Sequence, residues 1–136
     1  MSLNSPRYTF KKEERLSRKK IIDNLFKSGR SFYINPFRVV YLKGVTDGPF
    51  PAQILITVSR KSYQSIPERN LIRRKIREAY RYSKGEFYEA LNSAQMSCAF
   101  ILMYSGHKSL STAEIRQKIN QCLKRLMREL NEHYSS

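Results

Sequence analysis

The chain has 136 residues, with 26 Lys and Arg against 11 Asp and Glu, so its formal net charge is +15 at pH 7. This length and a hydrophobic content of 40% predict one globular domain over residues 1–136, with residues 1–12 flexible, and the charge favours a polyanion as partner. No apolar run reaches the roughly 18 residues that span a bilayer, and the basic N-terminal residues argue against a secretory signal. We therefore expect a cytoplasmic protein without a membrane partner.

A helix and two strands are predicted in the first part of the chain. The helix follows Ser17, a suitable N-cap residue, and ends at Gly29. Its apolar residues recur at helical spacing: Ile21, Ile22, Leu25 and Phe26. Residues 37–43 alternate like a strand, and residues 44–51 are typical of a turn. Residues 52–58 should then form the second arm of an antiparallel hairpin.

An arginine-rich helix is predicted next. It should begin near Pro67 and Glu68, which suit a first helical turn, and run to about Lys84. Gly85 is expected to end this helix, and a shorter amphipathic piece should follow over residues 87–91.

A buried strand and a closing helix complete the fold. Residues 98–104 are nearly all apolar, which is typical of a strand buried on both faces. Residues 111–114 have the spacing of a capping box, and apolar residues continue at helical spacing to Leu130. The resulting order, αββαβα, predicts an α+β fold, a single sandwich with helices packed on one small central sheet.

The arginine-rich helix carries two different faces. At about 100° per residue, one narrow stripe is apolar and contains Ile72, Ile76, Ala79 and Tyr80. The adjacent arc is basic and contains Asn70, Arg73, Arg74, Arg77 and Arg81, with Arg69 at its border. Arg outnumbers Lys five to one between residues 69 and 81, and the Arg side chain forks onto phosphate and stacks on bases. The pattern favours an RNA-binding helix over a merely solvated helix face.

Aromatic and basic residues also gather between residues 18 and 41. Phe26, Phe32, Tyr33, Phe37 and Tyr41 lie among six Lys and Arg residues, the combination that holds single-stranded nucleic acid. The alternative is that most of these aromatic side chains belong to the core.

No constellation for protein-based catalysis is evident. His107 and His133 are isolated, and no pair of carboxylates has a spacing that suggests a shared Mg²⁺. Cys98 and Cys122 lie in apolar contexts and are interpreted as reduced core residues. If an assembly that contains this chain cleaves RNA, the RNA must supply the active site.

The motif Arg69-Asn70, Arg73-Arg74, Arg77-Glu78, preceded by Val58-Ser59-Arg60-Lys61, closely resembles the signature of the bacterial ribonuclease P protein component. The resemblance covers about residues 8–130. It implies a protein that binds the catalytic RNA of ribonuclease P and assists removal of the 5′ leader from precursor tRNA. It also implies a left-handed βαβ crossover around the arginine-rich helix, although right-handed crossovers are the default.

The resemblance assigns roles to individual residues. The residues implied to bind the catalytic RNA are Arg69, Asn70, Arg73, Arg74, Arg77, Arg81, Arg60 and Lys61. Those implied to line a cleft for the leader are Phe26, Phe37, Tyr41, Ile22, Lys19 and Arg38. Arg73 replaces a Lys that is usual in the family, and Ile22 replaces an aromatic residue of some members.

The expected cofactors are the catalytic RNA and Mg²⁺, which the RNA would mainly bind. The expected partners are ribonuclease P RNA and precursor tRNA, with no obligate protein partner. Two alternatives remain open at this stage: a structural or ribosomal RNA-binding protein without a role in cleavage, and a DNA-binding module with the arginine-rich helix in a major groove.

Overall fold

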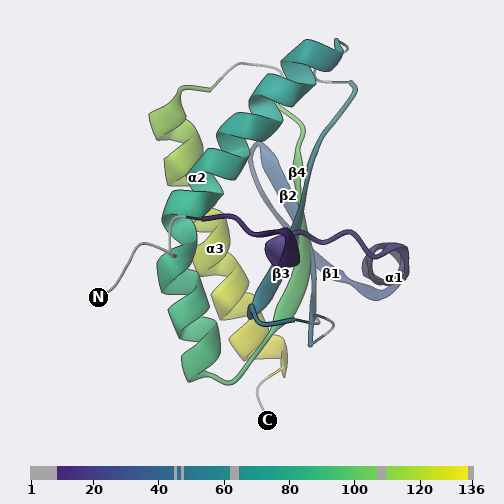
Figure 1. The fold of residues 1–136 in the computed structure, drawn as a ribbon, viewed down its shortest axis with the longest axis vertical. Helices are drawn as coiled ribbons and strands as arrows, with labels where there is room; N and C mark the ends of the chain where they lie inside the picture. The colour runs from purple at the N-terminus through teal and green to yellow at the C-terminus, as the bar shows by residue number, and fades with distance from the viewer. Residues whose placement is uncertain (1–8, 45, 47, 62–64, 107–109, 135–136) are drawn as a thin grey trace.

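The structure, a computed structural model, describes residues 9–44, 46, 48–61, 65–106 and 110–134. One mixed sheet separates two layers of helices (Figure 1). In chain order the elements are the short 3-10 helix η2 (Lys12–Glu14), α1 (Lys19–Ser28), β1 (Arg30–Ile34), β2 (Phe37–Lys43), β3 (Ala52–Val58), α2 (Ile66–Ser93), β4 (Cys98–Tyr104) and α3 (Thr112–Tyr134). Helices α2 and α3 cover one face of the sheet, and α1 lies on the other. The α+β class is therefore confirmed.

The strand order corrects the predicted hairpin. The order is β1-β2-β4-β3, so β2 and β3 do not pair with each other. Strand β4 lies between them, antiparallel to β2 and parallel to β3. The long α2 crossover joins β3 to β4. The physical reason is that β4 is the most continuously apolar strand, and an interior position buries both of its faces.

Strand β1 was not predicted from the sequence. It pairs with β2 in antiparallel register, with Ile34 opposite Phe37 across a tight turn at Asn35-Pro36. As an edge strand of only five residues, it buries Phe32 but leaves Tyr33 exposed. A strand this short carries too little alternation to stand out from the turn residues that follow it.

Helix α2 is longer than predicted, because it continues through Gly85 to Ser93 over 28 residues. Glycine inside a helix costs about 1 kcal/mol relative to alanine. Phe87 and Leu91 are buried and extend the apolar stripe of the first half, so their packing offsets that penalty. At the other end, the Ser65 hydroxyl caps the helix by accepting from the Glu68 amide at 3.2 Å.

The remaining element predictions are confirmed, with one shift at a helix end. Helix α1 ends before Gly29 as expected, but its N-cap is Arg18 rather than Ser17. Helix α3 begins with the predicted capping box: the Ser111 hydroxyl accepts from the Glu114 amide, and the Glu114 carboxylate accepts from the Ser111 amide.

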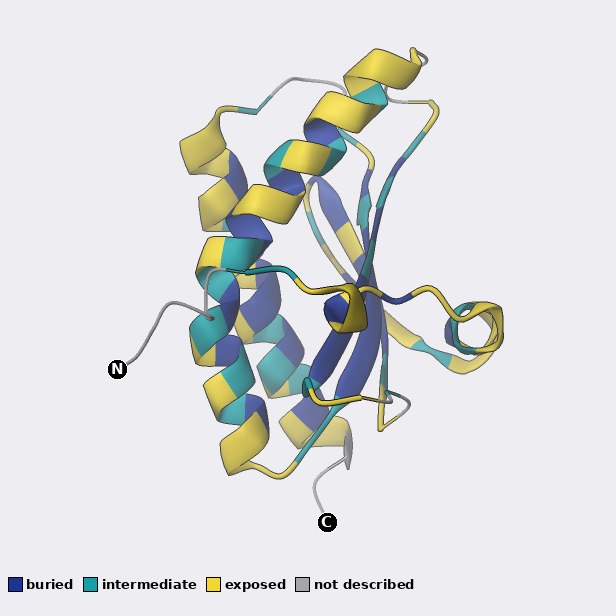
Figure 2. Ribbon diagram, in the orientation of Figure 1, coloured by how far each residue is buried: buried dark blue, intermediate teal, exposed yellow. Residues whose placement is uncertain are grey.

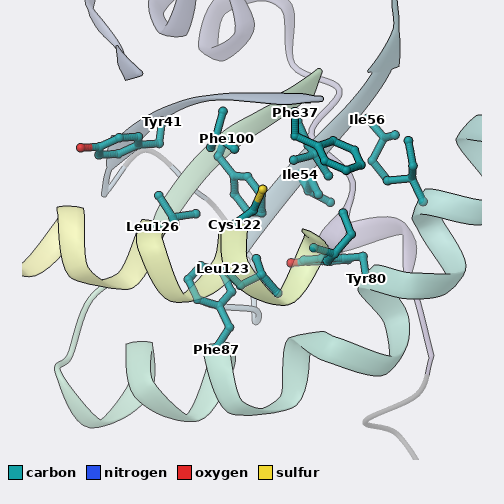
Figure 3. Close-up of a cluster of buried hydrophobic side chains, with 14 of the residues drawn as sticks. Phe37, Tyr41, Ile54, Ile56, Tyr80, Phe87, Phe100, Cys122, Leu123 and Leu126 are labelled. Carbon is teal, nitrogen blue, oxygen red and sulfur yellow. The ribbon is translucent and has the colours of Figure 1, made fainter. Parts of the chain in front are cut away.

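The core has two parts because alternate residues of each strand point to opposite faces. The larger part lies between the sheet and α2 and α3 (Figure 3), and it includes Tyr41, Tyr80 and Phe100. The smaller part lies under α1, where Leu25 packs with Val40 and Ile101.

The predicted flexible segment is partly packed on the fold. Residues 1–8 lie outside the described residues. Beyond them, Phe10 packs edge-on against Tyr80, with ring centroids 6.0 Å apart, and the Thr9 carbonyl accepts a hydrogen bond from Lys84. Thr9 and Phe10, within the segment predicted to be flexible, therefore contact α2.

Candidate nucleic-acid interface

The basic side chains of α2 form one surface, which we call the arginine face: Arg69, Asn70, Arg73, Arg74, Arg77 and Arg81. Asn70, Arg74 and Arg77 are exposed, and the other three are half-buried. Figure 2 shows exposed and buried stretches alternating along α2. On the adjacent side of the helix Ile72, Ile76 and Tyr80 are buried. The two faces predicted for this helix therefore exist.

Part of the arginine face is held in place before any ligand binds. The Arg73 guanidinium donates to the Asn70 side-chain oxygen at 2.8 Å. Arg81 differs, because it makes an ion pair with Glu78 at 2.9 Å and stacks over Tyr82 at 5.3 Å. Asn70, Arg73, Arg74 and Arg77 also line a shallow hollow of about 360 Å³. Among the described residues, three guanidinium groups and no acidic side chain border this hollow, an environment suited to phosphate.

Arg60 and Lys61 follow directly after β3 and are both exposed. The Lys61 amide donates to the Ser59 hydroxyl at 3.2 Å. Only four residues separate Lys61 from the start of α2. The structure therefore brings Arg60 and Lys61 to the end of the molecule that carries Arg69.

Phe37 and Tyr41 do not line an open cleft, contrary to the assignment made from the sequence. Both side chains are completely buried on the sheet face that α2 and α3 cover. Phe37 packs against Tyr104 with ring centroids 5.4 Å apart, and the Tyr41 hydroxyl donates to Glu129. Because the side-chain period of a strand is two, a one-residue error in aligning β2 exchanges its faces.

The face of β2 toward α1 instead carries Arg38, Val40 and Leu42. Arg38 is exposed, and Val40 is buried under the helix. The half-buried side chains of Leu42, Leu55 and Met103 extend this surface across β2, β3 and β4. Sequence reasoning missed these three residues, although the same alternation that buries Tyr41 places Leu42 on the other face.

Helix α1 contributes Lys19, Ile22 and Phe26 along one ridge, at spacings of three and four residues. Phe26 is 59% exposed, whereas Ile22 is half-buried against the sheet. The α1 side of the sheet thus carries four of the six predicted cleft residues: Lys19, Ile22, Phe26 and Arg38. Phe32 is a core residue, with the Arg125 guanidinium 5.0 Å from its ring centre.

The possible metal ligands do not coincide with the arginine face. Within the described ranges, three such groups come together only at Glu129, Glu132 and His133, near the end of α3. Glu129 already accepts from Tyr41 and Arg125, and the His133 ring lies 3.4 Å from it. These residues do not fit a Mg²⁺ site, which needs several free oxygen ligands in octahedral geometry. His107 lies outside the described residues.

Both cysteines are free and buried. Burial raises the pKa of the Cys98 thiol well above its usual range and that of Cys122 to about 12. Both thiols therefore stay protonated at neutral pH, which makes them poor nucleophiles.

Comparison with known proteins identifies the family. The family model described as ribonuclease P matches residues 10–127 of this chain. The chain belongs to the ribonuclease P protein family. The ribonuclease P protein component of Porphyromonas gingivalis is 31% identical over 98 residues, which cover 72% of each chain. That of Chlorobium phaeobacteroides is 30% identical over 125 residues, covering 85% of this chain and 86% of the relative.

Solved ribonuclease P proteins share the fold. The Staphylococcus aureus protein superposes with a TM-score of 0.65 at 21% identity, covering 83% of this chain and 94% of the other. The Thermotoga maritima protein gives a TM-score of 0.64 at 24% identity, covering 82% and 96%. Family membership makes this chain the protein subunit of a ribonucleoprotein endonuclease, ribonuclease P. No helix among the described residues is long and apolar enough to cross a membrane.

Proposed function

We propose that this ribonuclease P protein binds the catalytic RNA through its arginine face and the 5′ leader of precursor tRNA through the α1 side of its sheet. The observation that carries the proposal is the arginine face itself, in which Asn70 fixes Arg73 beside the exposed Arg74 and Arg77. Guanidinium groups held in position bind phosphate with little further loss of side-chain entropy.

The contribution of the chain to cleavage is electrostatic and geometric. Arg73, Arg74 and Arg77 neutralise phosphates of the catalytic RNA, and Arg60 and Lys61 extend this field at the same end of the molecule. Mg²⁺ is held by RNA oxygens in this proposal, because the described carboxylates do not gather on the arginine face. Neutralised phosphates let the RNA fold closely, which strengthens its own sites for the metal.

The leader lies on the other face of the sheet. Phe26 offers an exposed ring on which a base can stack, and Lys19 and Arg38 supply charge for the backbone. Such a stack contributes about 1 to 3 kcal/mol per base and tolerates any sequence. We also propose a cytoplasmic location, since the RNA partner and the precursor tRNA are made there in bacteria.

The proposal is tested by cleavage of a 5′-end-labelled precursor tRNA at low Mg²⁺. The reactions contain the protein alone, a bacterial ribonuclease P RNA alone, or both. Cleavage at the mature 5′ end is expected only in the mixture. If the protein binds the RNA tightly but does not enhance cleavage, the chain is a structural RNA-binding protein and the proposed function is wrong.

A further inference from the structure

Residues 9–18 form a strap that runs from α2 across the edge of the sheet to α1, and Figure 1 shows it as the purple segment in front of the sheet. At one end Phe10 packs on Tyr80 of α2. Near the other end the Leu16 amide donates to the Ile54 carbonyl at 2.9 Å, so the strap also extends the edge of β3. Both ends are thus tied to rigid elements.

A buried carboxylate holds the middle of the strap. Glu14 is completely buried and makes an ion pair with Lys84 of α2, which is only 2% exposed. The same carboxylate accepts from the Tyr88 hydroxyl at 2.7 Å and from the Lys11 amide at 2.6 Å. Burial raises the pKa of the Tyr88 hydroxyl, which keeps it protonated as a donor. Because Lys84 neutralises it, Glu14 adds no negative charge to the surface of the strap.

The outer surface of the strap and the start of α1 are therefore strongly basic. Six exposed cations occur between residues 11 and 20, with Glu13 as the one exposed acid in that range: Lys11, Lys12, Arg15, Arg18, Lys19 and Lys20. Lys12, Arg15 and Arg18 border a hollow of about 360 Å³. Its lining also includes one acidic residue, Glu13, together with Ser17, Gly48 and Gln53. The Gln53 amide donates to the Glu13 carbonyl at 3.0 Å, which fixes the strap beside this hollow.

The strap also lies between the two surfaces of the proposed function. The strap crosses α2 at Lys84, which lies about two helical turns beyond Arg77 and on the same side of the helix. Lys84 is buried although Arg77 is exposed, because the strap covers the helix only there. At its other end the strap leads directly into Lys19 of α1. The strap thus places exposed cations between the arginine face and the α1 side of the sheet.

We infer that the strap is a third RNA-binding element, in which Lys12, Arg15 and Arg18 bind phosphodiester groups of RNA that passes between the arginine face and α1. The inference rests on the proposed function. It adds a binding element that recognises backbone phosphates. This element has no base specificity, because Lys and Arg on an open surface bind the phosphate oxygens of any sequence.

The test compares two triple variants that each remove three positive charges. The strap variant is Lys12→Ala with Arg15→Ala and Arg18→Ala. The control variant is Lys124→Ala with Arg116→Ala and Arg128→Ala, three exposed cations of α3. Binding is measured as a function of salt in two arms: to ribonuclease P RNA alone, and to precursor tRNAs with long or short leaders in the presence of that RNA.

The strap variant should lower the log–log salt slope by about 0.7 to 0.9 for each phosphate that is no longer neutralised, and the control should leave it nearly unchanged. Weaker binding in the first arm identifies the catalytic RNA as the source of the phosphates, and weaker binding only with long leaders identifies the leader. If strap and control variants give the same slopes in both arms, the inference is overturned.

Two further measurements keep the outcomes distinct. Wild-type protein that neither binds ribonuclease P RNA nor enhances cleavage would overturn the proposed function, whereas equal behaviour of the two triple variants with an active wild type overturns the strap alone. If thermal unfolding shows that the triple variant does not fold, Lys12→Gln and Arg15→Gln are measured singly, and Arg15→Lys should restore the wild-type slope.

Discussion

Lys84 has a structural role that its position in the sequence does not indicate. In the sequence it is one more cation at the end of a basic helix, yet it lies buried against Glu14, 70 positions away along the chain. Burial lowers the pKa of its ammonium group, and the hydrogen bond that it donates to Glu14 opposes that shift. Burying the two charges as a pair costs much less free energy than burying either charge alone.

We predict that Lys84→Met lowers the free energy of unfolding by about 3 to 5 kcal/mol, because it leaves the Glu14 carboxylate buried without its cation. The double variant with Glu14→Gln should recover most of that stability. Urea unfolding of the three proteins measures both effects. Equal destabilisation of the single and double variants would show that the interaction between Lys84 and Glu14 does not contribute to stability.

Glu129 gives a second prediction at this scale, through pH. The Arg125 side chain donates to its carboxylate at 2.8 Å and is the main reason why the pKa of Glu129 is lowered; the Tyr41 hydroxyl adds to this shift. A lowered pKa in the folded state stabilises the fold above the unfolded pKa of about 4.3. That stabilisation disappears as the pH falls through the folded value.

Glu129→Gln should therefore reduce the free energy of unfolding by about 1 kcal/mol at neutral pH, and by less at acidic pH. The measurement is urea unfolding of wild type and variant at pH 7 and below pH 4. The exposed Glu132, one turn away, is the control, since Glu132→Gln should change stability little at either pH. If Glu129→Gln lowers the free energy of unfolding equally at both pH values, the prediction is contradicted.

At the scale of elements, α2 carries both a buried apolar stripe and the arginine face that we propose binds RNA. Arg77→Ala should weaken binding to ribonuclease P RNA and reduce the log–log salt slope by about 0.7 to 0.9, because the variant neutralises one phosphate fewer. Lys75→Ala removes the same charge from another side of α2 and should have a much smaller effect. Binding titrations at several salt concentrations separate the two. An unchanged slope and affinity for Arg77→Ala would remove the arginine face from the interface.

Helix α1 supplies the corresponding prediction for the leader. Because Phe26 is mostly exposed, Phe26→Ala should leave thermal stability nearly unchanged. It should weaken binding of long-leader precursor tRNA by about 1 to 3 kcal/mol, the contribution of one base stack, without affecting a short-leader substrate. The control is Tyr33→Ala, a similarly exposed aromatic residue of β1. An equal effect on both leader lengths would exclude a stack on the leader.

At the scale of the whole molecule, the net charge of +15 acts on stability as well as on binding. Like charges on one small domain repel each other, and this repulsion is present even without RNA. Raising NaCl from about 0.01 to about 0.1 M shortens the screening length from about 30 to about 10 Å. The melting temperature of the free protein should therefore rise over this range. A constant or falling melting temperature in calorimetry would show that the charges are already compensated within the fold.

The sequence by itself determined the properties that depend on neighbours along the chain. The arginine face and the buried stripe of α2 follow from a helical period, which needs only residues a few positions apart. The capping box of α3 and the buried character of β4 are local in the same sense, and the motif around Arg69 and Asn70 pointed to the correct family. Net charge is a sum and needs no structure at all.

The tertiary structure alone decided everything that depends on which distant segments meet. Strand β4 enters between β2 and β3 because the interior position buries both of its faces, an advantage that no turn between β2 and β3 reveals. The same choice turns Phe37 and Tyr41 into the core and Arg38 toward α1. Packing of Phe87 and Leu91 carries α2 past Gly85, and burial of Glu14 against Lys84 turns an apparently flexible N-terminal segment into the strap. In each case the stabilising free energy comes from contacts between segments that are far apart in the sequence. Local sequence patterns contain no information about such contacts.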